Sequence, residues 1–139
     1  VSLWLWSHFK KKTLNYIGFG GTGQQIRDVL DIDDLCDLIF MQIKKLTKVH
    51  NLTFCVGGGK KSNFKLKELT KLCEKITTNK IIIKKIKKTS IYDIPYFVTC
   101  NKTISKVYGW SPKKNLSDLI KDTLSWQKTY FKVLKKYLK

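Results

Sequence analysis

Apolar residues recur along the chain with two different spacings, which separate expected helices from expected strands. Spacings near 3.6 residues predict helices over residues 2–12, from a cap at Asp33 or Asp34, from Ser62, over 103–108 and from about Ser117 onward. Short apolar or loosely alternating runs predict extended segments at 14–17, 26–32, 52–56 and 81–86. This mixture of strands and helices predicts an α/β fold.

The helical stripes also predict which side chains are buried. Each stripe places apolar residues on one face of a helix, and that face is expected to cover a core. The predicted stripes are Leu35, Leu38, Ile39, Ile43 and Leu46 in the second helix, Leu66, Leu69, Leu72, Cys73 and Ile76 in the third, and Leu116, Leu119, Ile120, Leu124, Phe131, Leu134 and Leu138 in the last.

Length and composition are those of one globular domain over residues 1–139, with 42% hydrophobic residues. The net charge of +18 comes from 27 lysines and one arginine, Arg27. Nucleic-acid readers rely on the bidentate and stacking contacts of arginine, which lysine cannot copy. Because the lysines are also scattered along the chain, the composition favours a solvated lysine surface over a nucleic-acid patch.

The cysteines and histidines predict neither a metal site nor a catalytic one. Cys36, Cys55, Cys73 and Cys100 form no C-x-x-C pair, and no histidine lies at zinc-ligand spacing from them. They are interpreted as buried free thiols of a reducing cytoplasm, and His8 and His50 as exposed or helix-end residues. No apolar run approaches the roughly 20 residues that a membrane-spanning helix needs.

The run "GFGGTG" matches the dinucleotide fingerprint G-x-G-x-x-G through Gly18, Gly20 and Gly23. That fingerprint must open a helix directly and be followed about 20 residues later by an acidic residue. Here "QQIRDVLDI" follows, without a helical stripe, and Lys44 and Lys45 lie where the acid belongs. The context therefore predicts no cofactor site at these glycines.

Three segments in order carry a resemblance to a known family. They are "YIGFGGTGQQIRDVLDIDDLCDLI", "FCVGGGKKSNFKLKELTKLCEKIT" and "YDIPYFVTCNKTISKVYGWSPK". Together they resemble the extended short-chain dehydrogenase/reductase family of nucleotide-sugar epimerases and dehydratases, with most similarity to its CDP-paratose (CDP-tyvelose) 2-epimerase subgroup. The resemblance implies the C-terminal, substrate-binding portion of a Rossmann-type enzyme. The same resemblance implies that the N-terminal Rossmann half, with the NAD-binding loop and the catalytic Tyr-x-x-x-Lys, is not part of this sequence.

The resemblance also implies a ligand and the residues that hold it. The ligand is a nucleotide-diphosphate sugar, with a CDP-sugar favoured. Arg27 would contact the pyrophosphate, Gln25 would be its polar neighbour, and Tyr16 and Ile17 would lie near the base. NAD would bind the absent half, so the chain alone is not expected to be catalytic. The competing interpretation of Arg27 is a surface ion pair with a nearby aspartate, either Asp28 or Asp33.

The sequence departs from the family pattern at two positions. Ser90 stands where the family has a second arginine, and Cys100 stands where it has an aspartate.

Two alternative functions compete with the one that the resemblance implies. One alternative is a non-enzymatic basic module that binds polyanions or nucleic acid. The other is a fragment that pairs with a separately encoded Rossmann half through its apolar start, Leu3 to Phe9.

Overall fold

The computed structural model describes residues 1–46 and 51–137, which gather into two compact units made of discontinuous segments. Unit 1 comprises Val1–Gln25, Lys65–Pro95 and Ser117–Lys139. Unit 2 comprises Ile26–Phe64 and Tyr96–Leu116. The predicted α/β class is confirmed, since both units combine helices with short strands.

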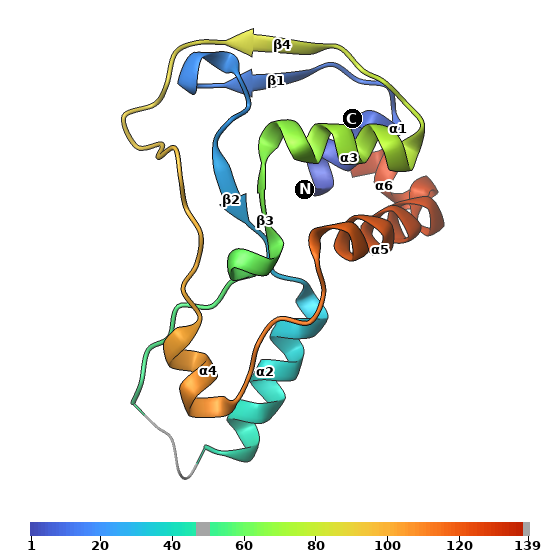
Figure 1. The fold of residues 1–139 in the computed structure, drawn as a ribbon. Helices are drawn as coiled ribbons and strands as arrows, with labels where there is room; N and C mark the ends of the chain where they lie inside the picture. Colours follow the sequence, from blue (N-terminus) through green and yellow to red (C-terminus); the bar gives the residue numbers. More distant parts are fainter. Residues whose placement is uncertain (47–50, 138–139) are drawn as a thin grey trace. The chain divides into compact units, whose positions relative to one another are not determined.

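Unit 1 is built around a short parallel strand pair. Its elements are α1 (Ser2–Phe9), β1 (Leu14–Ile17), the 3-10 turn η1 (Phe19–Gly21), α3 (Leu66–Thr77), β4 (Ile83–Ile86), α5 (Leu116–Thr129) and α6 (Phe131–Tyr137). Strands β1 and β4 run side by side with Leu14 opposite Ile83 and Ile17 opposite Ile86 (Figure 1). Both strands were expected from their apolar runs, although β4 starts two residues later than predicted.

Aromatic and hydroxyl side chains join α1 to its neighbours in unit 1. The Thr70 hydroxyl accepts hydrogen bonds from Trp4 Nε1 at 2.9 Å and from the Tyr16 hydroxyl at 2.7 Å. It also donates to the carbonyl of Leu66 at 3.1 Å. Thr70 therefore links α1, β1 and α3 from one buried position. On another side of α1, the Trp6 ring lies 5.8 Å from the ring of Phe131.

Unit 2 holds the second core. Its elements are β2 (Ile26–Asp28), α2 (Ile32–Lys44), the 3-10 turn η2 (Gly59–Ser62), β3 (Asn63–Lys65) and α4 (Lys102–Tyr108). Strands β2 and β3 pair, and Ile26 also forms a parallel bridge with Tyr96. Leu38 of α2 packs with the buried side chains of Ile104, Tyr108 and Trp110.

Helix α2 differs from the predicted helix in its cap and in its buried face. It begins at Ile32 because Asp31, rather than Asp33 or Asp34, is the N-cap and accepts a bond from the Asp33 amide at 2.9 Å. Of the predicted stripe only Leu38 is buried, whereas Ile39, Ile43 and Leu46 are 44%, 60% and 66% exposed. A stripe is buried only where another element covers it, and within unit 2 the core residues cover α2 at Leu38.

Other predicted boundaries were also wrong. Residues 52–56 form no strand among the described residues, since Phe54 and Val56 pack onto the core without a strand partner. Ser62 does not start a helix, because its hydroxyl donates to the carbonyl of Lys114. Helix α3 begins at Leu66, where the Lys65 amide donates to the Glu68 carboxylate at 2.9 Å. The last predicted helix is broken at Tyr130 into α5 and α6.

The environments of the cysteines differ from the prediction. All are free, but only Cys73 is buried, and Cys36, Cys55 and Cys100 are exposed. His8 lies near the end of α1 as expected, but it is fully buried, with Nδ1 3.0 Å from the carbonyl oxygen of Asn79. His50 and Leu138 lie outside the described residues.

Burial raises the pKa of the Cys73 thiol to about 12, which leads to a first prediction. At pH 8 we expect the native chain to react with iodoacetamide at Cys36, Cys55 and Cys100 but not at Cys73, because the thiolate is the nucleophile. The same shift predicts that the free energy of unfolding falls as the pH rises from about 9 towards 12, because the unfolded thiol ionises near pH 9 and the buried native thiol does not. Mass spectrometry of the alkylated peptides measures the first effect. Labelling of Cys73 as fast as of Cys55 would contradict it.

Candidate functional site

The four predicted ligand residues fall on both sides of the boundary between the two units. Tyr16, Ile17 and Gln25 belong to unit 1, and Arg27 belongs to unit 2. Tyr16 and Ile17 lie in β1, Gln25 follows the glycine-rich turn, and Arg27 is the middle residue of β2.

The glycine-rich turn serves packing within unit 1. Gly18, Gly20, Gly21 and Gly23 all have positive φ, between 67° and 77°. A Cβ on Gly21 would lie 2.8 Å from the Cβ of Lys85, and one on Gly23 would lie 2.9 Å from the Tyr16 ring. Only glycine fits these two positions, because a side chain would meet both strain and overlap.

The turn does not fit a dinucleotide. Such a site needs backbone N–H groups that open a helix and point at the pyrophosphate. Here the turn leads into strand β2, and three of its amides already donate hydrogen bonds within unit 1. Gly18 N donates to the Ile86 carbonyl, Phe19 N to the Thr89 hydroxyl and Gly21 N to the Gly18 carbonyl.

The three predicted ligand residues of unit 1 differ in which of their atoms a ligand could still contact. Tyr16 is only 8% exposed, and its hydroxyl is bonded to Thr70. Ile17 is 55% exposed, and its carbonyl accepts from Gln25 Nε2 at 3.2 Å. The remaining amide oxygen, Gln25 Oε1, is buried with no hydrogen-bond partner among the described residues. Gln25 is thus oriented by β1 while keeping one unused acceptor.

Arg27 lies in strand β2, and its two neighbours in that strand are hydrogen-bonded to other segments of unit 2. The half-buried guanidinium donates through Nη1 to the Ile26 carbonyl at 2.7 Å. That carbonyl also accepts from the Phe97 amide at 3.0 Å. On the other side, Asp28 Oδ2 accepts from the Gly59 amide at 2.7 Å and from the Thr99 amide at 3.2 Å. Because side chains alternate along a strand, Arg27 and Asp28 point to opposite faces.

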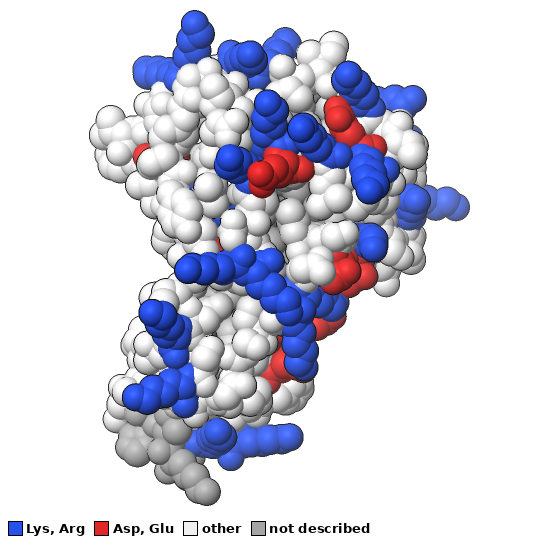
Figure 2. All heavy atoms as spheres, in the orientation of Figure 1, with Lys and Arg blue, Asp and Glu red and all other residues white. Residues whose placement is uncertain are grey.

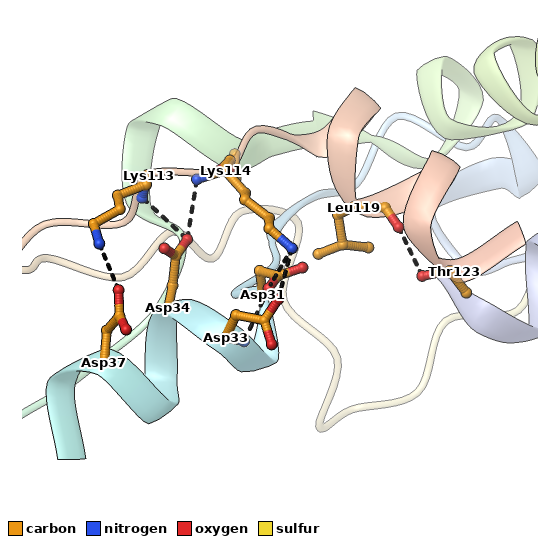
Figure 3. Close-up of polar contacts among 9 residues, drawn as sticks. Asp31, Asp33, Asp34, Asp37, Lys113, Lys114, Leu119 and Thr123 are labelled. Carbon is orange, nitrogen blue, oxygen red and sulfur yellow. Dashed lines mark hydrogen bonds and ion pairs between the residues drawn. The ribbon is translucent and has the colours of Figure 1, made fainter. Parts of the chain in front are cut away.

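The aspartates that follow β2 have structural contacts within unit 2. Asp34 is 3% exposed, and its Oδ2 accepts from the backbone amides of Lys113 and Lys114, both at 3.0 Å (Figure 3). Lys114 Nζ lies 2.8 Å from Asp33. The bond from Lys113 Nζ to Asp37 raises the pKa of Lys113. Among the described residues no group of three or more His, Cys, Asp or Glu could hold a metal ion.

Ser90 and Cys100, the two positions at which the sequence departs from the family pattern, are both exposed. Ser90 is exposed, and its hydroxyl accepts from the Tyr92 amide at 3.3 Å. Cys100 precedes α4, whose N-cap is Asn101. The side chain of Asn101 does not cap the helix, because its Oδ1 accepts from Gly57 N and its Nδ2 donates to the Gly57 carbonyl. The importance of Asn101 was not apparent from the sequence, since its partner is 44 residues away.

Comparison with known proteins supports the resemblance seen in the motifs. The chain is 29% identical to CDP-paratose 2-epimerase of Salmonella typhi over 76% of its own length. It resembles the nucleotide-sugar epimerases in sequence and shares their fold. It spans only 31% of the length of that curated relative. No protein-family model matches the sequence.

Solved structures agree on the fold. UDP-glucose 4-epimerase of Thermotoga maritima, crystallised with UDP-glucose, matches 93% of this chain with a TM-score of 0.74 at 19% identity. UDP-glucuronic acid 4-epimerase of Bacillus cereus, in complex with UDP-glucuronic acid and NAD, matches 90% with a TM-score of 0.76 at 19% identity. The matches cover 39% and 38% of those two chains, so the fold is that of a part of such enzymes. Within the described residues, no helix is both long enough and apolar enough to cross a membrane.

Proposed function

We propose that this chain is the nucleotide-sugar-binding portion of an NAD-dependent nucleotide-sugar epimerase of the CDP-paratose 2-epimerase type. Arg27 would hold the diphosphate, and a CDP-sugar is the favoured ligand. The observation that carries the proposal is the one arginine among 27 lysines, on a strand that is anchored on both sides of it through the Ile26 carbonyl and the Asp28 carboxylate. The sequence similarity to CDP-paratose 2-epimerase supports the choice of ligand.

The chemistry of the guanidinium explains why arginine is needed there. Its planar fork can donate two parallel hydrogen bonds to phosphate oxygens, and it is charged at every physiological pH. A lysine ammonium would supply only a point charge. Lys and Arg side chains are scattered across the face seen in Figure 2, and 27 of these 28 residues are lysines, so a general attraction for anions is available without Arg27. Arg27 therefore contributes geometry in addition to charge.

NAD would bind the part of the enzyme that this chain does not match. The glycine-rich turn does not fit a dinucleotide, as described above, and the relative from Bacillus cereus was solved with NAD in a chain of which this one covers 38%. In the intact enzyme NAD supplies hydride transfer. We therefore expect this chain alone to bind the nucleotide-sugar without turning it over.

Calorimetric titration with CDP-glucose and UDP-glucose tests the proposal. Arg27→Ala should weaken binding about 10- to 100-fold, since charge-assisted hydrogen bonds contribute about 1.5–3 kcal/mol, and Arg27→Lys should recover only part of it. Lys106→Ala, which removes an equal charge from the exposed face of α4, should change affinity less than 2-fold. If Arg27→Ala binds as tightly as the parent, the assignment is wrong. A steeply salt-dependent affinity for DNA without any response to either nucleotide-sugar would instead support the basic binding module.

A further inference from the structure

A cavity of about 680 Å³ lies within unit 2 and is lined by none of the four predicted ligand residues. Its wall comes from the turn at 58–61, the segment 96–102 that leads into α4, and residues 111–112. Its size falls within the range of small-molecule sites in proteins. Asp28, the neighbour of Arg27 in β2, contacts Gly59 and Thr99, two residues of this wall.

The charged side chains of the wall are all positive. Lys60, Lys61 and Lys102 line the cavity, and none of its described lining residues is acidic. Lys61 is held in place, since its Nζ donates to the carbonyl of Lys113 at 2.6 Å and to that of Pro112 at 3.3 Å. Asp28 lies behind the wall, where two backbone amides engage its carboxylate. The cavity therefore favours an anion.

The remaining lining favours a planar or apolar group on the same molecule. Tyr96 is 57% exposed and borders the cavity together with Val98 and Pro112. An aromatic face and aliphatic side chains accept flat apolar surface. Ser105 and Ser111 add hydroxyl groups that can donate to phosphate oxygens.

We propose that this cavity binds a small organic phosphate bearing a planar or apolar group, at a site separate from Arg27. The lysines supply the attraction for the phosphate, and Tyr96 with its aliphatic neighbours covers the organic part. This site does not depend on the nucleotide-sugar site proposed above, because the two share no residue.

Cys100 reports on the occupancy of the cavity without any mutation, because its exposed thiol lines the wall. The full chain is alkylated with iodoacetamide, a neutral reagent, and each cysteine is quantified by mass spectrometry. Phenyl phosphate at 10 mM, a concentration of the order expected for a small ligand with few contacts, should slow labelling of Cys100 at least about 5-fold. Labelling of Cys36 and Cys55 is the internal control and should not change.

Probes and variants separate the possible outcomes. Phenol and inorganic phosphate at the same concentration should each protect Cys100 less than 2-fold. A Lys60→Gln, Lys102→Gln double variant should lose the protection, whereas Lys106→Gln, outside the wall, should keep it. Arg27→Ala should also keep it, which distinguishes this site from the nucleotide-sugar site. Absence of protection by phenyl phosphate would overturn the site, and equal protection by inorganic phosphate would overturn the ligand class.

Discussion

Replacing Gly58 with alanine is expected to lower the free energy of unfolding of unit 2 by about 3 kcal/mol, in the upper part of the range for overpacking. Gly58 has φ −70° and ψ −21°, a conformation that alanine adopts without strain. Its Cβ, however, would overlap the carbonyl oxygen of Val29 and lie 2.8 Å from the Cβ of Ser62. The turn would have to move away from β2, which would also break the bond from the Gly59 amide to Asp28.

Gly109→Ala is the matched control for this prediction. Gly109 ends α4 with φ +71°, and nothing lies within 4 Å of a Cβ built there. Alanine at Gly109 therefore meets strain without overlap, and we expect a loss of about 1 kcal/mol. Urea unfolding followed by circular dichroism measures both variants. Equal losses at the two positions would show that the overlap with Val29 is relieved at little cost.

Thr70→Val is expected to destabilise unit 1 by about 2–4 kcal/mol. Valine keeps the shape of threonine but removes the acceptor that serves both Tyr16 and Trp4. The Tyr16 hydroxyl is then left buried without a partner, and each unsatisfied group costs about 1–3 kcal/mol. Urea unfolding monitored by tryptophan fluorescence measures the loss, because Trp4 reports directly on this region.

Thr70→Ser separates hydrogen bonding from packing at this position. Serine keeps the hydroxyl and loses only a methyl group, so we expect a loss of about 1 kcal/mol. If valine is tolerated better than serine, packing of the methyl group outweighs the two hydrogen bonds. In that case the proposed role of Thr70 as the link between α1, β1 and α3 is wrong.

The mismatch between predicted and observed burial on α2 has a direct physical explanation. The stripe of Leu35, Leu38, Ile39, Ile43 and Leu46 has helical spacing, and a helix forms there. Burial, however, depends on which residues α4 and the Trp110 segment bring against the helix, and those contacts join positions more than 60 residues apart in the chain. The same reason applies to Cys55, whose predicted strand has no partner strand among the described residues.

Local sequence was sufficient for the elements whose signals lie within a few residues. Helix α1, which ends at Phe9 rather than at residue 12, strands β1 and β4 and helix α4 follow from spacing and propensity among neighbouring residues. The family resemblance also came from local motifs in order.

Only the tertiary structure decided which polar groups meet. The shared acceptor at Thr70, the engagement of Asn101 by Gly57 and the positively charged cavity join segments that are 35 or more residues apart. Chain spacing carries no signal for such contacts, because the packing of other elements sets the distance between the groups. For Arg27, the sequence predicted a role in ligand binding, and the structure added the anchoring of its strand on both sides.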